Sequence, residues 1–92
     1  MEVTFMHRPE WNWERDAVTL FCERDGQRFI ARVSIEALMS SYGARMNDGD
    51  EALRACTKHQ SEIEQRIRSA FESHGNRPFR EVTVAATGVR IE

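Results

Sequence analysis

Two β-favouring runs lie on either side of a tight-turn sequence near the middle of the chain. The runs cover residues 17–23 and 28–33, and Asp25-Gly26 stands between them. A type I′ turn needs positive φ at both central residues, and Asp-Gly is one of the strongest short signals for it. The pattern therefore predicts a β-hairpin with a two-residue loop.

The two-residue loop fixes which side chains share a face of this hairpin. One face is apolar and is predicted to be core; it carries Val18, Leu20, Cys22, Phe29, Ala31 and Val33. The opposite face pairs Phe21 with Ile30 and frames them with Thr19, Arg32, Glu23 and Arg28. Cross-strand neighbours interact directly. An apolar pair framed by charges is therefore predicted on the second face.

Helical patterns follow the hairpin. Ser34 can cap a short helix over residues 35–42, which Gly43 would end in a left-handed conformation. A long helix is predicted over residues 50–74, ending at Gly75, with Asp48 and Glu51 resembling a capping box and Asp50 as a rival cap. Its buried stripe is predicted from residues that recur at spacings of three and four: Leu53, Cys56, Gln60, Ile63, Ile67, Ala70 and Phe71.

Charged residues fill the rest of the long helix and predict a solvated face. Acid-before-base pairs at i,i+4 support a helix by roughly 0.2–0.5 kcal/mol each. The pairs in this chain are Asp50–Arg54, Glu62–Arg66 and Glu64–Arg68.

The two ends of the chain carry shorter patterns than its middle. Residues 3–6 predict an edge strand, and residues 7–16, with Pro9, predict a loop. Trp11 and Trp13 lie in that loop, either as a lid that folds back over the core edge or as a ligand-stacking platform. Residues 79–85 alternate and predict a strand, followed by a short tail at 89–91.

Together these elements predict a single α+β domain over residues 1–92. Its sheet is expected to be antiparallel and centred on the hairpin, with a C-terminal strand and with one short and one long helix packed on one face. Nineteen of the 92 residues are Leu, Ile, Val or Phe, so the core is thin for a folded chain.

Composition narrows the function classes. The formal net charge is -2, which argues against a constitutive nucleic-acid coat. No apolar run approaches the roughly 18 residues of a membrane span, and no secretory signal is recognisable. With two cysteines, a disulfide scaffold is not expected. We expect a cytoplasmic protein that does not associate with membranes.

The order and spacing of several segments resemble the domain of unknown function 1488 family of small bacterial proteins. The segments that carry the resemblance are Phe5, then Trp11-Asn12-Trp13-Glu14-Arg15-Asp16-Ala17-Val18, then Gly26, then Val33-Ser34-Ile35-Glu36-Ala37-Leu38. The resemblance covers nearly the whole chain. It implies a compact α+β domain in a bacterial cytoplasm and brings no established activity.

The sequence contains few residues that could form a metal site or a catalytic site. Cys56 and His59 lie three residues apart on the predicted helix, and Cys22 points into the same core. A structural zinc site wants four ligands, and a catalytic Cys–His pair needs a third group to orient the histidine; neither set is evident. Both cysteines are expected to be buried small hydrophobes. We predict no catalytic, metal or cofactor-binding residues.

Three function classes stay open. The first is a non-catalytic interaction or regulatory module that self-associates, as a favoured dimer, through Phe21 and Ile30 with Arg28, Arg32 and Glu23 around them, and that has an unknown protein partner. The second is a nucleic-acid module that uses a weak basic patch of Arg28, Arg32 and Arg80, although nucleic-acid binding is not expected at this net charge. The third is an enzyme of unknown reaction. In a rival to the dimer, Trp11 and Trp13 cover the same sheet face within one chain.

Overall fold

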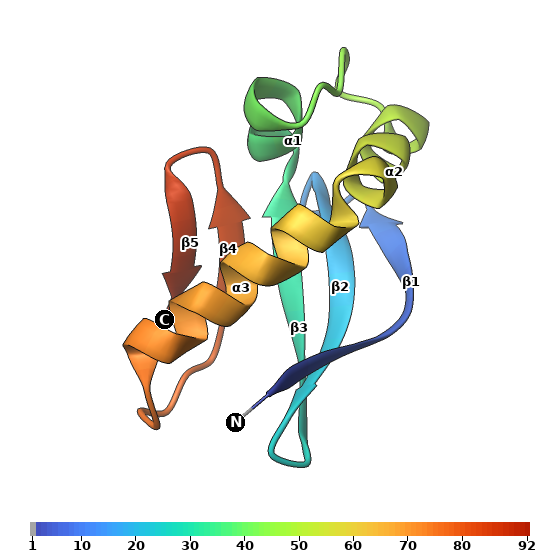
Figure 1. The fold of residues 1–92 in the computed structure, drawn as a ribbon. Helices are drawn as coiled ribbons and strands as arrows, with labels where there is room; N and C mark the ends of the chain where they lie inside the picture. The colour runs from blue at the N-terminus through green and yellow to red at the C-terminus, as the bar shows by residue number, and fades with distance from the viewer. Residues whose placement is uncertain (1) are drawn as a thin grey trace.

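The computed structural model describes residues 2–92, and within them five strands and three helices form an α+β fold (Figure 1). The strands are β1 (Val3–Asn12), β2 (Ala17–Arg24), β3 (Gln27–Ser34), β4 (Val82–Ala85) and β5 (Gly88–Ile91). The helices are α1 (Ile35–Ser41), α2 (Gly49–Lys58) and α3 (Gln60–His74). The strand order across the sheet follows the chain, from β1 to β5. The predicted α+β class is confirmed.

The central hairpin has the predicted register. Cys22 lies opposite Phe29, and Phe21 lies opposite Ile30. Asp25 and Gly26 have φ of 52° and 79°, as a type I′ turn requires. Each strand runs one residue further into the turn than predicted, to Arg24 and from Gln27. The division of the hairpin into a core face and an opposite face is therefore as expected.

The N-terminal segment corrects the prediction of a loop over residues 7–16. β1 continues to Asn12, and its register against β2 shifts between Met6 and Glu10. His7 has φ of 62° within this irregular stretch. Pro9 is tolerated because β1 is an edge strand and the chain bulges away from the ladder there. A proline that suggested a loop instead marks a bulge.

The predicted long helix is interrupted. α2 ends at Lys58 and α3 begins at Gln60, because His59 leaves the helical conformation with φ of -108° and ψ of 20°. The change of direction lets α2 contact β1 while α3 crosses the sheet to β5, as Figure 1 shows. Packing on the twisted sheet therefore overrides local helix propensity at this point.

The caps and charge pairs of these helices differ in part from expectation. Ser34 caps α1 as predicted, its hydroxyl accepting from the Ala37 backbone N–H at 3.1 Å. Asp48 is the N-cap of α2, but its side chain makes no capping hydrogen bond. Of the three predicted ion pairs, Glu64–Arg68 is present at 3.9 Å. The other two arginines choose other partners: Arg54 binds Glu51, and Arg66 donates to the Tyr42 hydroxyl.

The C-terminal strands make the sheet mixed rather than purely antiparallel. β4 pairs with β3 in parallel, and β5 then pairs with β4 antiparallel. Parallel neighbours need a long crossover connection, which the three helices between β3 and β4 supply. The expected tail over residues 89–91 is thus the edge strand β5.

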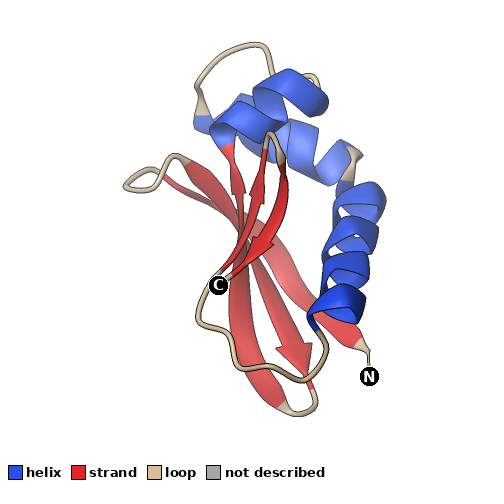
Figure 2. Ribbon diagram, turned by 90° about the vertical axis from the view of Figure 1, so that its left-hand side faces the viewer, coloured by secondary structure: helices blue, strands red, loops and turns tan. Residues whose placement is uncertain are grey.

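The helices pack against one face and one end of the sheet (Figure 2). We call this the inner face. Its fully buried side chains come from the predicted hairpin core, from β4, from α1 and from the predicted helix stripe. The largest of them are Leu38, Ile63, Ile67, Val18, Val33, Val82 and Val84. Both cysteines are buried among them, as predicted.

The Trp11 ring of β1 lies against Gly49 at the start of α2. A Cβ added at Gly49 would lie 2.7 Å from Cδ1 and 3.0 Å from Cγ of Trp11. We expect Gly49→Ala to lower the free energy of unfolding by about 1–3 kcal/mol through this overpacking. Denaturant unfolding of Gly49→Ala, with and without Trp11→Leu, checks it. If the loss persists in the Trp11→Leu background, the indole contact is not its cause.

Candidate interaction surface on the outer face of the sheet

The face opposite the helices, which we call the outer face, carries a row of apolar side chains across three strands. Met6 lies opposite Phe21 in the sheet, and Phe21 lies opposite Ile30. Within residues 2–92, none of the three helices packs over this row (Figure 2). Ile30 is 38% exposed, whereas Phe21 is half-buried and meets the edge of the His7 ring at a centroid distance of 5.7 Å. The predicted apolar pair is therefore an apolar row at the surface.

Charged side chains flank this row on both sides along the strands. On one side, Glu23 and Arg28 are cross-strand neighbours with 3.9 Å between a carboxylate oxygen and Nε. On the other side, Arg32 donates from Nη1 to a carboxylate oxygen of Glu81 at 3.1 Å. Two of the three arginines of the predicted basic patch therefore lie beside carboxylates, and the surface carries both signs of charge.

The two tryptophans do not gather over the outer face. Trp11 lies opposite Val18 on the inner face and packs against the core. Trp13 lies in the turn after β1 and is 75% exposed. Trp11 thus matches the expected fold-back onto the core edge, and Trp13 does not. The rival in which both cover the outer face is wrong because the strand alternation turns Trp11 to the other side.

The two sheet edges are poorly suited to pairing with another chain. β1 is interrupted by the bulge and by Pro9, and β5 has four residues. Bulges, prolines and very short strands are the usual protection of edge strands. The broad outer face is therefore a better surface for association than either edge.

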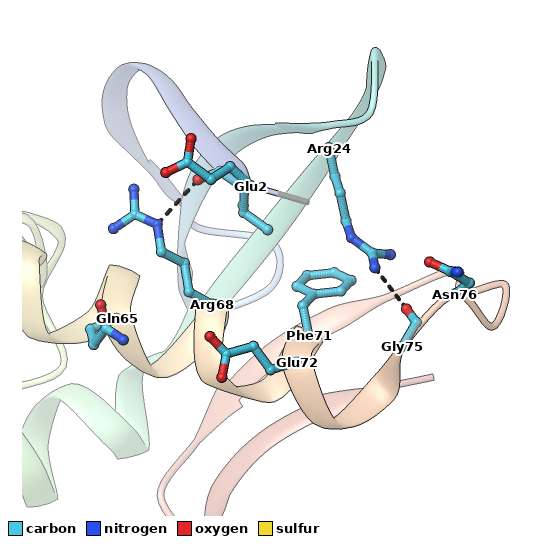
Figure 3. A pocket seen from close by; sticks show the side chains of 9 residues that line it. Glu2, Arg24, Gln65, Arg68, Phe71, Glu72, Gly75 and Asn76 are labelled. Carbon is cyan, nitrogen blue, oxygen red and sulfur yellow. Dashed lines mark hydrogen bonds between the residues drawn. The ribbon is translucent and has the colours of Figure 1, made fainter.

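A separate cavity lies between the start of β1 and the end of α3 (Figure 3). Its volume is about 540 Å³. Arg24 donates to the Gly75 carbonyl at 2.7 Å and lies over the Phe71 ring. Arg68 donates to the Val3 carbonyl at 3.2 Å and lies over a second aromatic ring. Both guanidinium groups thus join the strands to α3.

The alternation of side chains along the hairpin is enough to predict which face of the sheet carries Arg24. Arg24 has the same parity as Leu20 and Cys22, so its side chain belongs on the inner face. Glu2 and Glu72 also line the cavity, so its charge is mixed. The arrangement is typical of arginines that close the edge of a core rather than of an anion site.

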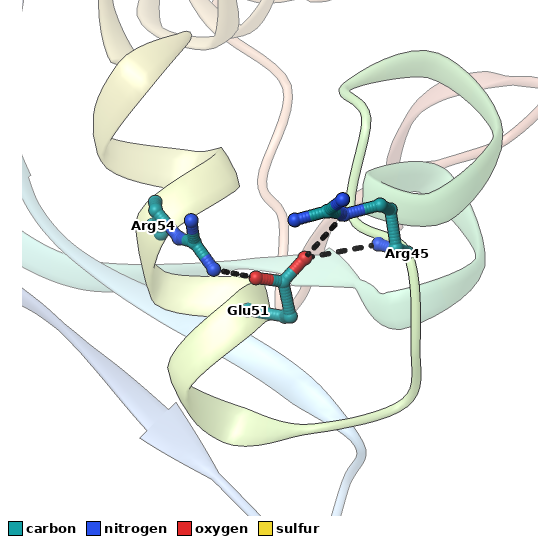
Figure 4. Close-up of polar contacts among 3 residues, drawn as sticks. All are labelled: Arg45, Glu51 and Arg54. Carbon is teal, nitrogen blue, oxygen red and sulfur yellow. Dashed lines mark hydrogen bonds and ion pairs between the residues drawn. The ribbon is translucent and has the colours of Figure 1, made fainter.

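A second charged cluster joins the loop before α2 to that helix (Figure 4). Glu51 accepts from the backbone N–H of Arg45 at 3.2 Å and also binds the Arg54 side chain. Its side chain is mostly buried, whereas both arginine side chains are exposed. Glu51 therefore fastens the loop, which explains why it does not serve in the capping box predicted for it.

The two thiols lie deep in the core. Burial, together with a smaller effect of the charge of Glu64, raises the pKa of Cys22 and of Cys56 to about 12. A hydrogen bond from the backbone of Ala31 opposes the rise at Cys22. Thiols in this environment are protonated and inert at neutral pH.

Two further kinds of site are a metal centre and a membrane-spanning helix. Among residues 2–92, no group of three or more His, Cys, Asp and Glu side chains is placed to hold a metal ion. In the same residues, no helix combines the length and the apolar character that crossing a bilayer requires.

Comparison with known proteins gives a family but no activity. The model of the family described as "Protein of unknown function (DUF1488)" matches residues 3–84. A crystal structure of a protein of unknown function from the DUF1488 family of Shewanella loihica PV-4 is similar in fold, with a TM-score of 0.70 and 16% identity. The similarity covers 80% of this chain and 84% of that one. No curated protein matches this sequence.

Proposed function

The chain belongs to the DUF1488 family of proteins of unknown function, and we propose that it is a non-catalytic interaction module that self-associates through its outer face. One observation carries the proposal: the apolar row of Met6, Phe21 and Ile30 lies on the sheet face opposite all three described helices. The resemblance of the sequence to this family supports a bacterial source, and we propose that the protein is cytoplasmic.

The energetic argument rests on the size of these side chains. Burying a large apolar side chain stabilises by about 1.5–3 kcal/mol relative to leaving it exposed. A 92-residue domain with a thin core gains little from its own interior, and oligomerisation is a common remedy for small domains. Covering the row with a second subunit adds apolar burial that a monomer lacks.

The charges around the row favour a copy of the same chain over a polyanion. Arg28 and Arg32 each lie within 4 Å of a carboxylate, at 3.9 and 3.1 Å. A nucleic-acid backbone approaching this face would meet Glu23 and Glu81 as well as the arginines. A second copy presents both signs of charge and an identical apolar row.

Replacing Phe21 by lysine is expected to convert a dimer into a folded monomer. The ammonium group would sit in the centre of the buried contact without a counter-charge, and such a group is strongly unfavourable. We expect light scattering to give the wild type about twice the chain mass of 10.7 kDa and Phe21→Lys about one chain mass. Circular dichroism must show that the variant keeps its fold.

Met46→Lys is the matched control, since Met46 is 56% exposed and lies in the loop before α2 rather than on the outer face. It should leave the dimer unchanged. A wild-type mass near 10.7 kDa at micromolar concentration would end the proposal.

A further inference from the structure

We propose that the two copies meet about a two-fold axis that runs parallel to the strands, between β2 and β3. This arrangement rests on the proposed self-association and specifies its geometry. Each Phe21 then lies over the partner's Ile30, and each Glu23 faces the partner's Arg28. These pairs make the face self-complementary.

The register of the sheet defines a grid on the outer face. One row contains Glu23 and Arg28, the next contains Phe21 and Ile30, and the third contains Thr19 and Arg32. In every row the first residue is on β2 and the second is on β3. A face-to-face dimer must place this grid on a rotated copy of itself, because a two-fold contact uses the same surface on both subunits.

Two axis directions bring Phe21 and Ile30 of one copy onto Phe21 and Ile30 of the other. An axis parallel to the strands exchanges β2 with β3 and keeps every row opposite its own row. An axis along the row exchanges the flanking rows instead. In that second case, Arg28 would face the partner's Arg32, and Glu23 would face the partner's Thr19.

The charges select the axis parallel to the strands. It sets an acid opposite a base twice, once in each symmetry-related half. The other axis sets no acid directly opposite a base, because it turns Arg28 toward the partner's Arg32, whose side chain is 19% exposed and binds Glu81. Arg28 has 78% of its side chain exposed, so it projects from the face and meets whatever lies opposite.

Reversing the charge of Arg28 distinguishes the two axes, because the dimer should weaken with one axis and tighten with the other. With the proposed axis, Arg28→Glu faces the partner's Glu23, and we expect the dimer dissociation constant to rise about tenfold. With the other axis, the new carboxylate faces the partner's Arg32, and the dimer tightens. Adding Glu23→Arg to this variant should restore affinity to within about threefold of wild type.

Cross-linking tests the same geometry without relying on charge. Packed sheets lie about 10 Å apart, and neighbouring strands about 4.8 Å, so the proposed axis places position 23 about 11 Å from its own copy. With the axis along the row, an offset of four residues at about 3.4 Å each raises that separation to about 17 Å. Glu23→Cys should therefore be joined by a bismaleimide with a spacer of about 10 Å.

Ile30→Cys is the matched control, because both axes bring position 30 close to its own copy. Cys22 and Cys56 are buried and should not react. Linkage at position 30 without linkage at position 23, or a tighter Arg28→Glu dimer, overturns the proposed axis alone. A monomeric wild type, together with no linkage of either Glu23→Cys or Ile30→Cys, overturns the proposed function and the axis together.

Discussion

Phe71→Ala is expected to lower the free energy of unfolding by about 3–5 kcal/mol, enough to unfold much of a small domain. Phe71 is 3% exposed and lies on α3 where the helix meets the sheet. Its ring centroid is 5.4 Å from that of Phe29 and 5.0 Å from that of Phe79. The Arg24 guanidinium lies 4.8 Å from the same ring centroid. The substitution thus removes a buried member of an aromatic cluster and a cation–π contact.

Denaturant unfolding followed by circular dichroism checks this expectation. Phe71→Leu is the matched variant, since it keeps apolar volume and should lose less than half as much stability. Phe79→Ala should also lose less, because Phe79 is only half-buried. A loss below about 1 kcal/mol for Phe71→Ala would show that α3 is not held by this cluster.

The register of the hairpin could be predicted to the residue because two independent signals agree. Asp25-Gly26 fixes the loop length, and the alternation of residues 17–24 then assigns each side chain to a face. The apolar pair of Phe21 and Ile30 on the outer face follows from the same two facts. The half of the candidate surface that lies on β2 and β3 was therefore available from the sequence.

The half of the surface that lies on β1 was not available. Four residue steps of β1, from Met6 to Glu10, lie opposite two steps of β2, from Phe21 to Thr19. This bulge accommodates Pro9 and a positive φ at His7, neither of which marks a continuing strand in sequence. The sequence pattern therefore does not indicate that Met6 joins the apolar row or that Trp11 lies against α2.

The helix break at His59 had no local signal either. Residues 50–74 contain neither proline nor glycine, and the stripe continues through the break with Cys56 and Ile63 both fully buried. The sheet supplies the reason for the break, because its twist carries β1 and β5 to positions that one straight helix would not contact. Breaks of this kind arise from tertiary packing, which a single-sequence pattern does not contain.

Alkaline pH is expected to destabilise the fold through its two buried thiols. Burial raises the pKa of Cys22 and Cys56 from 9.0 to about 12. Between pH 9 and pH 12 the unfolded chain releases these protons while the folded chain keeps them, so the free energy of unfolding falls as pH rises. The slope is up to about 1.4 kcal/mol per pH unit for each cysteine. Below pH 9 the contribution of the thiols is complete and does not change.

Urea unfolding at a series of pH values measures this slope for the wild type and for Cys22→Ala/Cys56→Ala. The two proteins differ only at positions 22 and 56, so the difference between the two slopes reports the thiols alone. We expect the wild type to lose stability more steeply above pH 9, although the variant starts lower because it leaves small cavities. Native wild-type protein should also react slowly with thiol reagents near pH 8, where almost none of either cysteine is thiolate. Equal slopes, or fast labelling of the folded protein, would show that the thiols are accessible and would contradict their placement in the core.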